Sequence, residues 1–377
     1  MRRLLWVFLL GGALLAQDKP GITFKPYGFV KFETVIDQNE TFKGDWMLFV
    51  PSGSDGNGGF TMNARHSRIG VKIGGGEFGD NGQVNGLIEM DFAGGFPNSG
   101  TAARQPIPRL RHAWVELVKP SWSLRLGQDW GLISGPFPST ASFVVGAGKG
   151  NLWMRFPQIK FTTGKGRVKA AFSVNRPIAG NIKYDDFAGG DFDVVGDGER
   201  SGRPWFMGRL WINCKRGGVS VMGHVGWEKI INTAVSDDMT SSYSVAAEGR
   251  LAMGKIALTA KGFTGKNLNT YLGGIFQGYR VQGNEIIGIR STGGWAQAKL
   301  SLSPTLSSTV GGGLEAINED DLVDNMRSKN SWFFMNLAKK VSSRVTFMVE
   351  AEHLTTAYQN LSNGENWRGM FVSLFTF

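Results

Sequence analysis

Basic side chains recur at positions that alternate with apolar ones along the chain. Arg68 and Lys72, for example, alternate with Ile69, Val71 and Ile73. Successive side chains of a β-strand point to opposite faces, so this spacing puts charge on one face and apolar groups on the other. Basic groups that line a narrow aqueous passage attract anions. The candidates with this spacing are Lys31, Arg68, Lys72, Arg125, Lys160, Lys169, Arg209, Lys261 and Lys299.

Carboxylates fall on the same set of faces and could oppose this effect. The candidates are Glu33, Glu89, Asp91, Glu116 and Asp129. Either these carboxylates neutralise the basic residues, or the basic residues lie at the rim of the passage, beside lipopolysaccharide phosphates at the membrane surface. The chain carries 41 Lys and Arg against 31 Asp and Glu, so we expect an excess of positive charge. The facing of Arg109 and Arg111 is ambiguous, because a bulge could shift their alternation.

Catalytic patterns are sparse. The four histidines, His66, His112, His224 and His353, lie in different segments, and neither HExxH nor GxSxG spacing occurs. Cys214 is the single cysteine, which excludes a disulfide framework. We expect no enzyme activity, cofactor, metal site or nucleic-acid partner, although a hydrolase remains an alternative. Glu350 and Glu352 share a strand face and are interpreted as charges that line water.

The elements that would position these charges are strands. Two-residue alternation of apolar and polar side chains is typical of half-exposed strands, and no segment has a convincing helical stripe. Short turns alternate with long polar segments, as in barrels that cross outer membranes. At roughly 22 residues per strand and connection, the chain would form about 16 antiparallel strands, the porin size class. The alternating stretches include 68–73, 84–92, 122–127, 167–175, 219–228, 243–251, 256–261 and 345–352.

The first residues are typical of a secretory signal peptide. A basic start, Met1-Arg2-Arg3, precedes an apolar run from Leu4 to Leu15 that is too short to span a bilayer. The sequence therefore predicts a signal peptide over 1–16 and one barrel domain over 17–377. No later run of 18 apolar residues occurs, so a helical membrane protein is excluded.

The last strand adds a membrane signal. Phe371, Phe375 and Phe377 share one face of the final stretch. A terminal aromatic residue with hydrophobic residues at two-residue steps is similar to the signal read by the barrel-insertion machinery. Aromatic residues near other strand ends, such as Trp122 and Trp227, favour interfacial girdles over a soluble sandwich. We expect the lipid bilayer and lipopolysaccharide of a Gram-negative outer membrane as surroundings.

One long connection is unusually apolar. The segment 134–149 contains small and apolar residues that would be costly in water unless packed. It is predicted to fold into the barrel as a constriction loop, and a lid or a subunit contact is the alternative. The constriction candidates are Gly135, Pro136, Phe137, Pro138 and Phe143. The acidic stretch 185–199 is interpreted as a solvated loop, because no EF-hand spacing is present.

Several short motifs together resemble the DcaP-like trimeric porins. The resemblance implies a 16-stranded homotrimeric barrel with a loop in the pore, passing small and often anionic solutes. Each motif is short, and their order along the chain carries the likeness. They are Gly28-Phe29-Val30-Lys31, Ser67-Arg68-Ile69-Gly70, Leu110-Arg111-His112-Ala113-Trp114, Gly127-Gln128-Asp129-Trp130, Gly135-Pro136, Pro157-Gln158-Ile159-Lys160-Phe161, Gly293-Gly294-Trp295-Ala296-Gln297 and Glu350-Ala351-Glu352.

From these observations we expect an outer-membrane diffusion porin for small hydrophilic solutes with a preference for anions. A channel for a hydrophobic or specific small substrate is the main alternative. The barrel hydrolase is the weaker one.

Overall fold

The computed structural model describes residues 21–42, 44–94, 106–178, 196–230 and 239–377. The predicted signal peptide at 1–16 lies outside these residues. So does most of the acidic stretch 185–199, of which only 196–199 are described.

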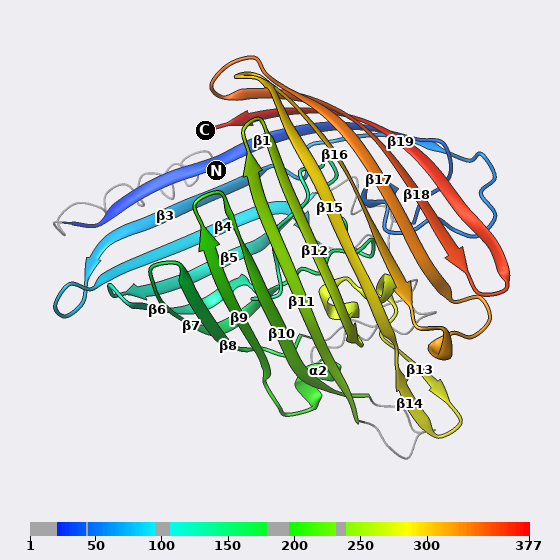
Figure 1. The fold of residues 1–377 in the computed structure, drawn as a ribbon, viewed down its shortest axis with the longest axis horizontal. Coiled ribbons are helices and arrows are strands. Elements are labelled where there is room, and N and C mark those ends of the chain that lie inside the picture. Colours follow the sequence, from blue (N-terminus) through cyan, green and yellow to red (C-terminus); the bar gives the residue numbers. More distant parts are fainter. Residues whose placement is uncertain (1–20, 43, 95–105, 179–195, 231–238) are drawn as a thin grey trace, which may run out of the picture.

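Apart from one two-stranded hairpin, the strands form one closed antiparallel sheet (Figure 1). β2 and β3 pair with successive parts of β1, so they act as one strand that is interrupted at 64–67. Counted in this way, the seventeen hydrogen-bonded segments make sixteen barrel strands, which confirms the predicted fold class. They are β1 (Thr23–Asp37), β2 (Gly59–Asn63), β3 (Arg68–Glu77), β4 (Gln83–Gly94), β5 (Ile107–Val118), β6 (Trp122–Trp130), β7 (Arg155–Lys165), β8 (Val168–Asn175), β9 (Trp205–Cys214), β10 (Gly217–Lys229), β11 (Met239–Met253), β12 (Ile256–Lys266), β15 (Arg290–Ser303), β16 (Leu306–Ile317), β17 (Arg327–Lys340), β18 (Val345–Tyr358) and β19 (Leu361–Thr376).

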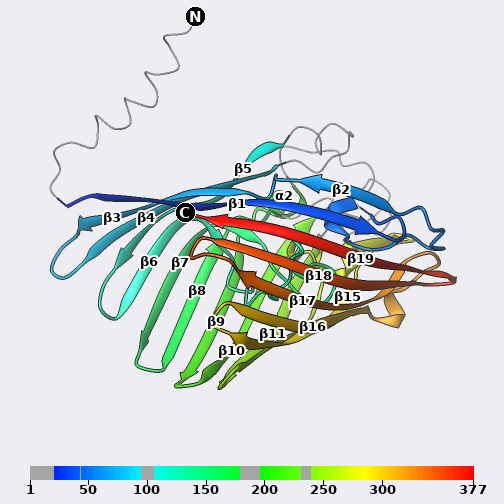
Figure 2. The same ribbon diagram turned by 90° about the horizontal axis from the view of Figure 1, so that it is seen from above.

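The barrel closes where its first and last strands meet. β19 runs antiparallel beside β1, with Val30 opposite Phe375 and Asp37 opposite Arg368 (Figure 2). Two backbone hydrogen bonds of 3.1 Å between Gly28 and Phe377 end this ladder. Closure pairs the outermost strands with each other and so removes the free edges that would otherwise expose unpaired backbone groups.

Short turns and long connections alternate around the barrel. The connections at one end carry the minor elements, and Figure 1 shows α2 and the β13–β14 hairpin at the end away from the C-terminus. No helix in the described ranges is long and apolar enough to span a membrane. The minor elements are η1 (Gly44–Trp46), α2 (Asp197–Arg200), η2 (Asn269–Tyr271), η3 (Gly274–Phe276), β13 (Tyr279–Gln282), β14 (Glu285–Gly288) and η4 (Glu319–Asp321).

The strands alternate between the two faces as their sequence predicts. On β10, Val219 and Val221 are 56% and 55% exposed, whereas Ser220 and Met222 between them are 1% and 2% exposed. Large apolar side chains with this outward facing recur around the barrel. In water such a surface would be unfavourable, but a bilayer accommodates it, and the polar side chains then face the interior.

The connection 131–154, between β6 and β7, folds into the barrel. The ammonium of Lys261 on β12 donates to the carbonyls of Ile133 and Leu152 at 2.7 and 2.8 Å. Three strands further along the wall, Asn336 on β17 donates to the carbonyl of Ser139 at 2.7 Å. The apolar residues at both ends of the connection, Leu132, Ile133 and Leu152, pack in one cluster with side chains of the wall. The predicted inward fold of this loop is therefore confirmed, and packing explains its apolar composition.

Candidate functional site

A cavity of about 480 Å³ lies between the inward loop and the barrel wall. Four basic residues from β1, β3, β5 and β7 line it: Lys31, Arg68, Arg111 and Arg155. No aspartate or glutamate of the described chain is among its lining residues. We call this space the basic chamber. Basic groups that line a confined space concentrate positive potential there.

Aromatic side chains form the other part of the chamber lining. Trp130 precedes the loop, and Phe137, Phe143 and Trp153 belong to it. The Phe143 ring stacks on His66 with a centroid distance of 3.8 Å, and the Phe137 ring lies 5.0 Å from that of Trp130. Of the other predicted constriction residues, Pro136 and Pro138 are buried and Gly135 is half-buried. The loop thus contributes an apolar surface to the chamber.

The nearby carboxylates pair with the basic residues but do not line the chamber. Glu33 pairs with Lys31 at 2.6 Å. Glu89 bonds to Arg111 at 2.8 Å and lies 3.5 Å from Arg68. These contacts hold the basic side chains in position and offset part of their positive charge. Neutralisation of this kind is one of the two possibilities that the sequence left open.

A bulge on β5 settles the facing of its arginines. Glu89 is opposite His112 and Met90 is opposite Leu110, so Arg111 is the extra residue. Arg111 and His112 are both buried as a result. Arg109 and Arg111 then hold Asp91 between them, at 2.7 and 2.8 Å.

Arg155 differs from the other basic residues of the chamber. It has no ion-pair or hydrogen-bond partner among the described residues, and its Nη1 is buried. Its guanidinium lies over the ring of Trp130 at 4.5 Å. Within the group formed by the basic residues Lys31, Arg68, Arg109, Arg111 and Arg155 and the carboxylates Glu33, Glu89 and Asp91, positive charges exceed negative ones by two. Arg155 is not among the candidates that the sequence offers, because it begins its strand directly after the apolar loop.

Arg125 and Lys160 form a separate and balanced cluster. Arg125 binds Glu116 at 2.7 Å and Asp129 at 2.5 Å, and Lys160 also binds Asp129 at 2.5 Å. His112 lies 3.0 Å from the same carboxylate. Two basic groups thus face two carboxylates, so this part of the wall contributes little net charge.

The remaining basic candidates lie elsewhere on the inward faces. Arg209 pairs with Glu248 and donates to the carbonyls of Leu132 and Ser134, so it supports the loop together with Lys261. Lys72 lies over the ring of Tyr27 at 5.0 Å. Lys169 and Lys299 are exposed and lie toward the short-turn ends of β8 and β15. None of these lines the basic chamber.

Glu350 and Glu352 contact the inward loop. Thr140 donates from its hydroxyl to Glu350 at 2.5 Å and lies 3.0 Å from Glu352. The backbone amide of Ala141 donates to Glu350 at 2.8 Å. The sequence placed both glutamates on one face but gave no sign that a loop far away in the chain would cover them.

Glu33, Asp45 and His66 bring ligand atoms within 4.8 Å of one another. Each already has a partner of another kind. Lys31 pairs with Glu33, Arg65 pairs with Asp45 at 2.6 Å, and Trp46 donates to His66 at 3.1 Å. Two basic groups next to the three residues disfavour a cation there, so this cluster is a structural network.

His224 contacts two serines, which bears on the hydrolase alternative. Its ring nitrogens lie 2.6 Å from the hydroxyl of Ser244 and 2.9 Å from that of Ser242. Both serines are at most 2% exposed. A nucleophile must reach its substrate, and these hydroxyls do not, so the contact does not support hydrolysis.

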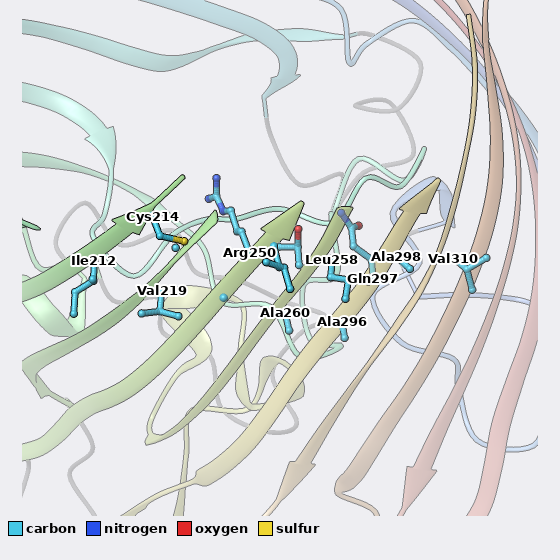
Figure 3. Close-up of a pocket in the computed structure, with 14 residues that line it drawn as sticks. Ile212, Cys214, Val219, Arg250, Leu258, Ala260, Ala296, Gln297, Ala298 and Val310 are labelled. Carbon is cyan, nitrogen blue, oxygen red and sulfur yellow. The ribbon is translucent and has the colours of Figure 1, made fainter. Parts of the chain in front are cut away.

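A larger concavity, of about 820 Å³, lies on the outer face of β9, β10, β11, β12, β15 and β16 (Figure 3). Its lining includes outward residues such as Val219, Leu258 and Val310, which are 56%, 38% and 40% exposed. These residues alternate with inward ones such as Lys261. The concavity therefore faces away from the barrel interior.

The C-terminal phenylalanines lie on the outer surface. Phe371, Phe375 and Phe377 are 40%, 40% and 45% exposed. Phe371 stacks on Phe347 of β18 at 5.9 Å. Their outward position is compatible with a role in membrane insertion, which stays a prediction.

No protein-family model matches the chain, and no curated protein matches it. Solved structures do. The outer membrane channel DcaP of Acinetobacter baumannii has a TM-score of 0.77 at 20% identity, over 96% of this chain and 99% of that one. OmpF of Salmonella typhi has a TM-score of 0.64 at 10% identity, over 95% and 98%. A trimer form of OmpT of Vibrio cholerae has a TM-score of 0.60 at 11% identity, over 95% and 100%. These likenesses show the fold, and at that level they confirm the resemblance to DcaP-like porins.

Proposed function

We propose that this chain is an outer-membrane diffusion porin that passes small hydrophilic solutes and prefers anions. One observation carries the proposal: the basic chamber is lined by Lys31, Arg68, Arg111 and Arg155, with no carboxylate of the described chain among its lining. An anion in the chamber meets positive potential from its walls, whereas a cation meets repulsion. The fold shared with outer-membrane channels supports the transport role.

The proposal extends to the surroundings of the protein. We infer a signal peptide over 1–16, insertion by the barrel-insertion machinery, and contact with lipid and lipopolysaccharide. The trimer form of the OmpT structure supports a homotrimer for this chain as a proposal. The apolar band of outward side chains supplies the surface that a bilayer or a second subunit would cover.

A second candidate is a channel for a specific small substrate with an apolar part. The aromatic lining of the chamber by Trp130, Phe137, Phe143 and Trp153 favours it. It differs from a general porin in one measurable respect. A specific substrate would block ion current at low concentration, whereas a general porin shows only the current expected from pore size and charge.

The test is single-channel recording of the purified protein in planar bilayers under a salt gradient. We expect a reversal potential that reports preference for chloride over potassium. Arg155→Glu should shift it toward cations, and more strongly at low salt, where the Debye length exceeds about 10 Å. Lys329→Glu is the matched control, since Lys329 is exposed and lies outside the chamber lining. A cation-selective wild-type channel would contradict the anion preference.

A further inference from the structure

Glu228 lies near the end of β10 and is fully buried. Neither carboxylate oxygen accepts a hydrogen bond of ordinary geometry, although the side-chain amide of Asn267 lies beside them, and no lysine or arginine of the described chain forms an ion pair with Glu228. Burying a charge without a partner is strongly unfavourable. Asp197 of α2 is also close enough to add negative potential at Glu228. The carboxyl group therefore requires either a proton or a bound cation, and the described residues supply no basic partner.

Other oxygen atoms gather around Glu228. Thr240 faces it directly in the β10–β11 register, and the Asn267 amide lies beside its carboxylate. The Thr240 hydroxyl, the Asn267 amide oxygen and the Tyr271 hydroxyl are all buried without hydrogen-bond partners. Such a concentration of unpartnered polar atoms is unusual, because buried polar groups in native proteins are nearly always satisfied.

The loop after β12 brings two of its own side-chain amide oxygens together. A Cβ atom at Gly278 would lie 2.8 Å from the amide oxygen of Asn267 and 2.7 Å from that of Asn269. Both amide oxygens thus converge on one point of the backbone. The backbone of Asn267 is itself fixed, since its amide donates to Ile289 at 2.7 Å and its carbonyl accepts from Ser242 at 2.8 Å.

We propose that Glu228, Asn267 and Thr240 form a binding site for a hard divalent cation such as Ca²⁺, with the Tyr271 hydroxyl at its edge. Carboxylate, amide and hydroxyl oxygens are the ligands that such cations prefer, and no nitrogen or sulfur ligand is required. The bound ion would neutralise Glu228. It would also join β10, β11 and the loop after β12, three neighbouring elements at the α2 end of the barrel (Figure 1).

The site differs from the cluster of Glu33, Asp45 and His66. There, Lys31 and Arg65 already occupy the carboxylates. Here the carboxylate has no basic partner among the described residues. It also lies outside the basic chamber lining, so it can be tested without reference to solute selectivity.

Terbium luminescence provides the test, since Tb³⁺ replaces Ca²⁺ at oxygen sites and is excited through nearby aromatic rings. The Tyr271 ring lies 5.9 Å from that of Trp205, so excitation at this site is available. We expect EDTA-treated wild-type protein in detergent to give a saturable signal that Ca²⁺ displaces. Glu228→Gln should weaken terbium binding at least roughly tenfold. Glu365→Gln, at an exposed carboxylate of β19, should leave it unchanged.

Two further measurements keep the test decisive if Glu228→Gln fails to fold. Thr240→Val keeps the carboxylate but removes one hydroxyl, and it should weaken terbium binding several-fold. Addition of Ca²⁺ to EDTA-treated wild-type protein should raise its unfolding temperature. Equal terbium titrations for wild type and the variants would mean that the ions bind only at the surface, and would overturn the proposal. So would an unfolding temperature that does not respond to Ca²⁺, which would indicate that a proton neutralises Glu228.

Discussion

Arg155 lies directly opposite Trp130 in the β6–β7 pair, with its guanidinium 4.5 Å above the indole ring. Trp130 is the last residue of β6 and Arg155 the first of β7, so the inward loop leaves and re-enters the wall at this pair. The base of the loop therefore coincides with the basic residue that has no carboxylate partner. The same residue pair therefore marks both the place where the loop joins the wall and the place where the chamber carries its unpaired positive charge.

We expect selectivity to depend more on Arg155 than on Arg125. Arg155→Gln removes an unpaired charge from the chamber, whereas Arg125→Gln removes a charge that Glu116 and Asp129 largely cancel. The reversal potential in a salt gradient should move clearly toward zero for the first variant and little for the second. An equal shift for both would show that ion pairing in the wall does not decide which charges a solute meets.

Lys261 should control how firmly the loop is held. Lys261→Met leaves the carbonyls of Ile133 and Leu152 buried without donors, at a cost of about 1–3 kcal/mol for each such group. We expect larger current noise and a lower unfolding temperature. Lys299→Met, at an exposed lysine outside the loop contacts, is the control. Quiet channels in Lys261→Met would mean that the apolar packing of Leu132, Ile133 and Leu152 suffices.

Deletion of Phe377 should slow assembly without changing conduction. Its backbone makes the two hydrogen bonds with Gly28 that end the closing ladder, and its ring lies outside the barrel. Insertion can be followed from the gel shift between unboiled and boiled samples. The channels that do form should have wild-type conductance, because no chamber residue is changed. Thr376→Ala is the control, and normal insertion of the deletion variant would remove the role assigned to Phe377.

Asp321 should make the rim at η4 sensitive to acid. Burial raises its pKa, but hydrogen bonds from Arg290 outweigh this and hold the pKa below its usual value. A carboxyl group with a lowered folded pKa stabilises the fold above its unfolded pKa of about 3.9. That contribution is lost as pH falls through the lowered value. The difference in unfolding temperature between wild type and Asp321→Asn should be present at pH 6 and shrink below pH about 4. A constant difference across this range would exclude the ion pair as its cause.

Local alternation was sufficient to predict the barrel. Strand residues such as Val219 and Ser220 reveal their facing through two-residue periodicity, and this pattern survives folding because a barrel has only an inside and an outside. The side of the barrel that Arg111 faces could not be predicted, because one inserted residue changes the alternation there. A bulge depends on pairing with the neighbouring strand, which a single segment does not reveal.

The sequence by itself determined the strand pattern, the apolar outer surface, the surplus of basic residues and an apolar loop that had to be packed. These follow from side-chain polarity and spacing, which act locally. Only the tertiary structure decided which charges remain free. Arg125 and Lys160 meet Asp129 across the wall, whereas Arg155 meets Trp130. Glu228 likewise becomes an unpaired buried carboxylate only when the loop after β12 covers it. Net charge at a site depends on distances between residues far apart in the chain, and closure of the barrel sets those distances.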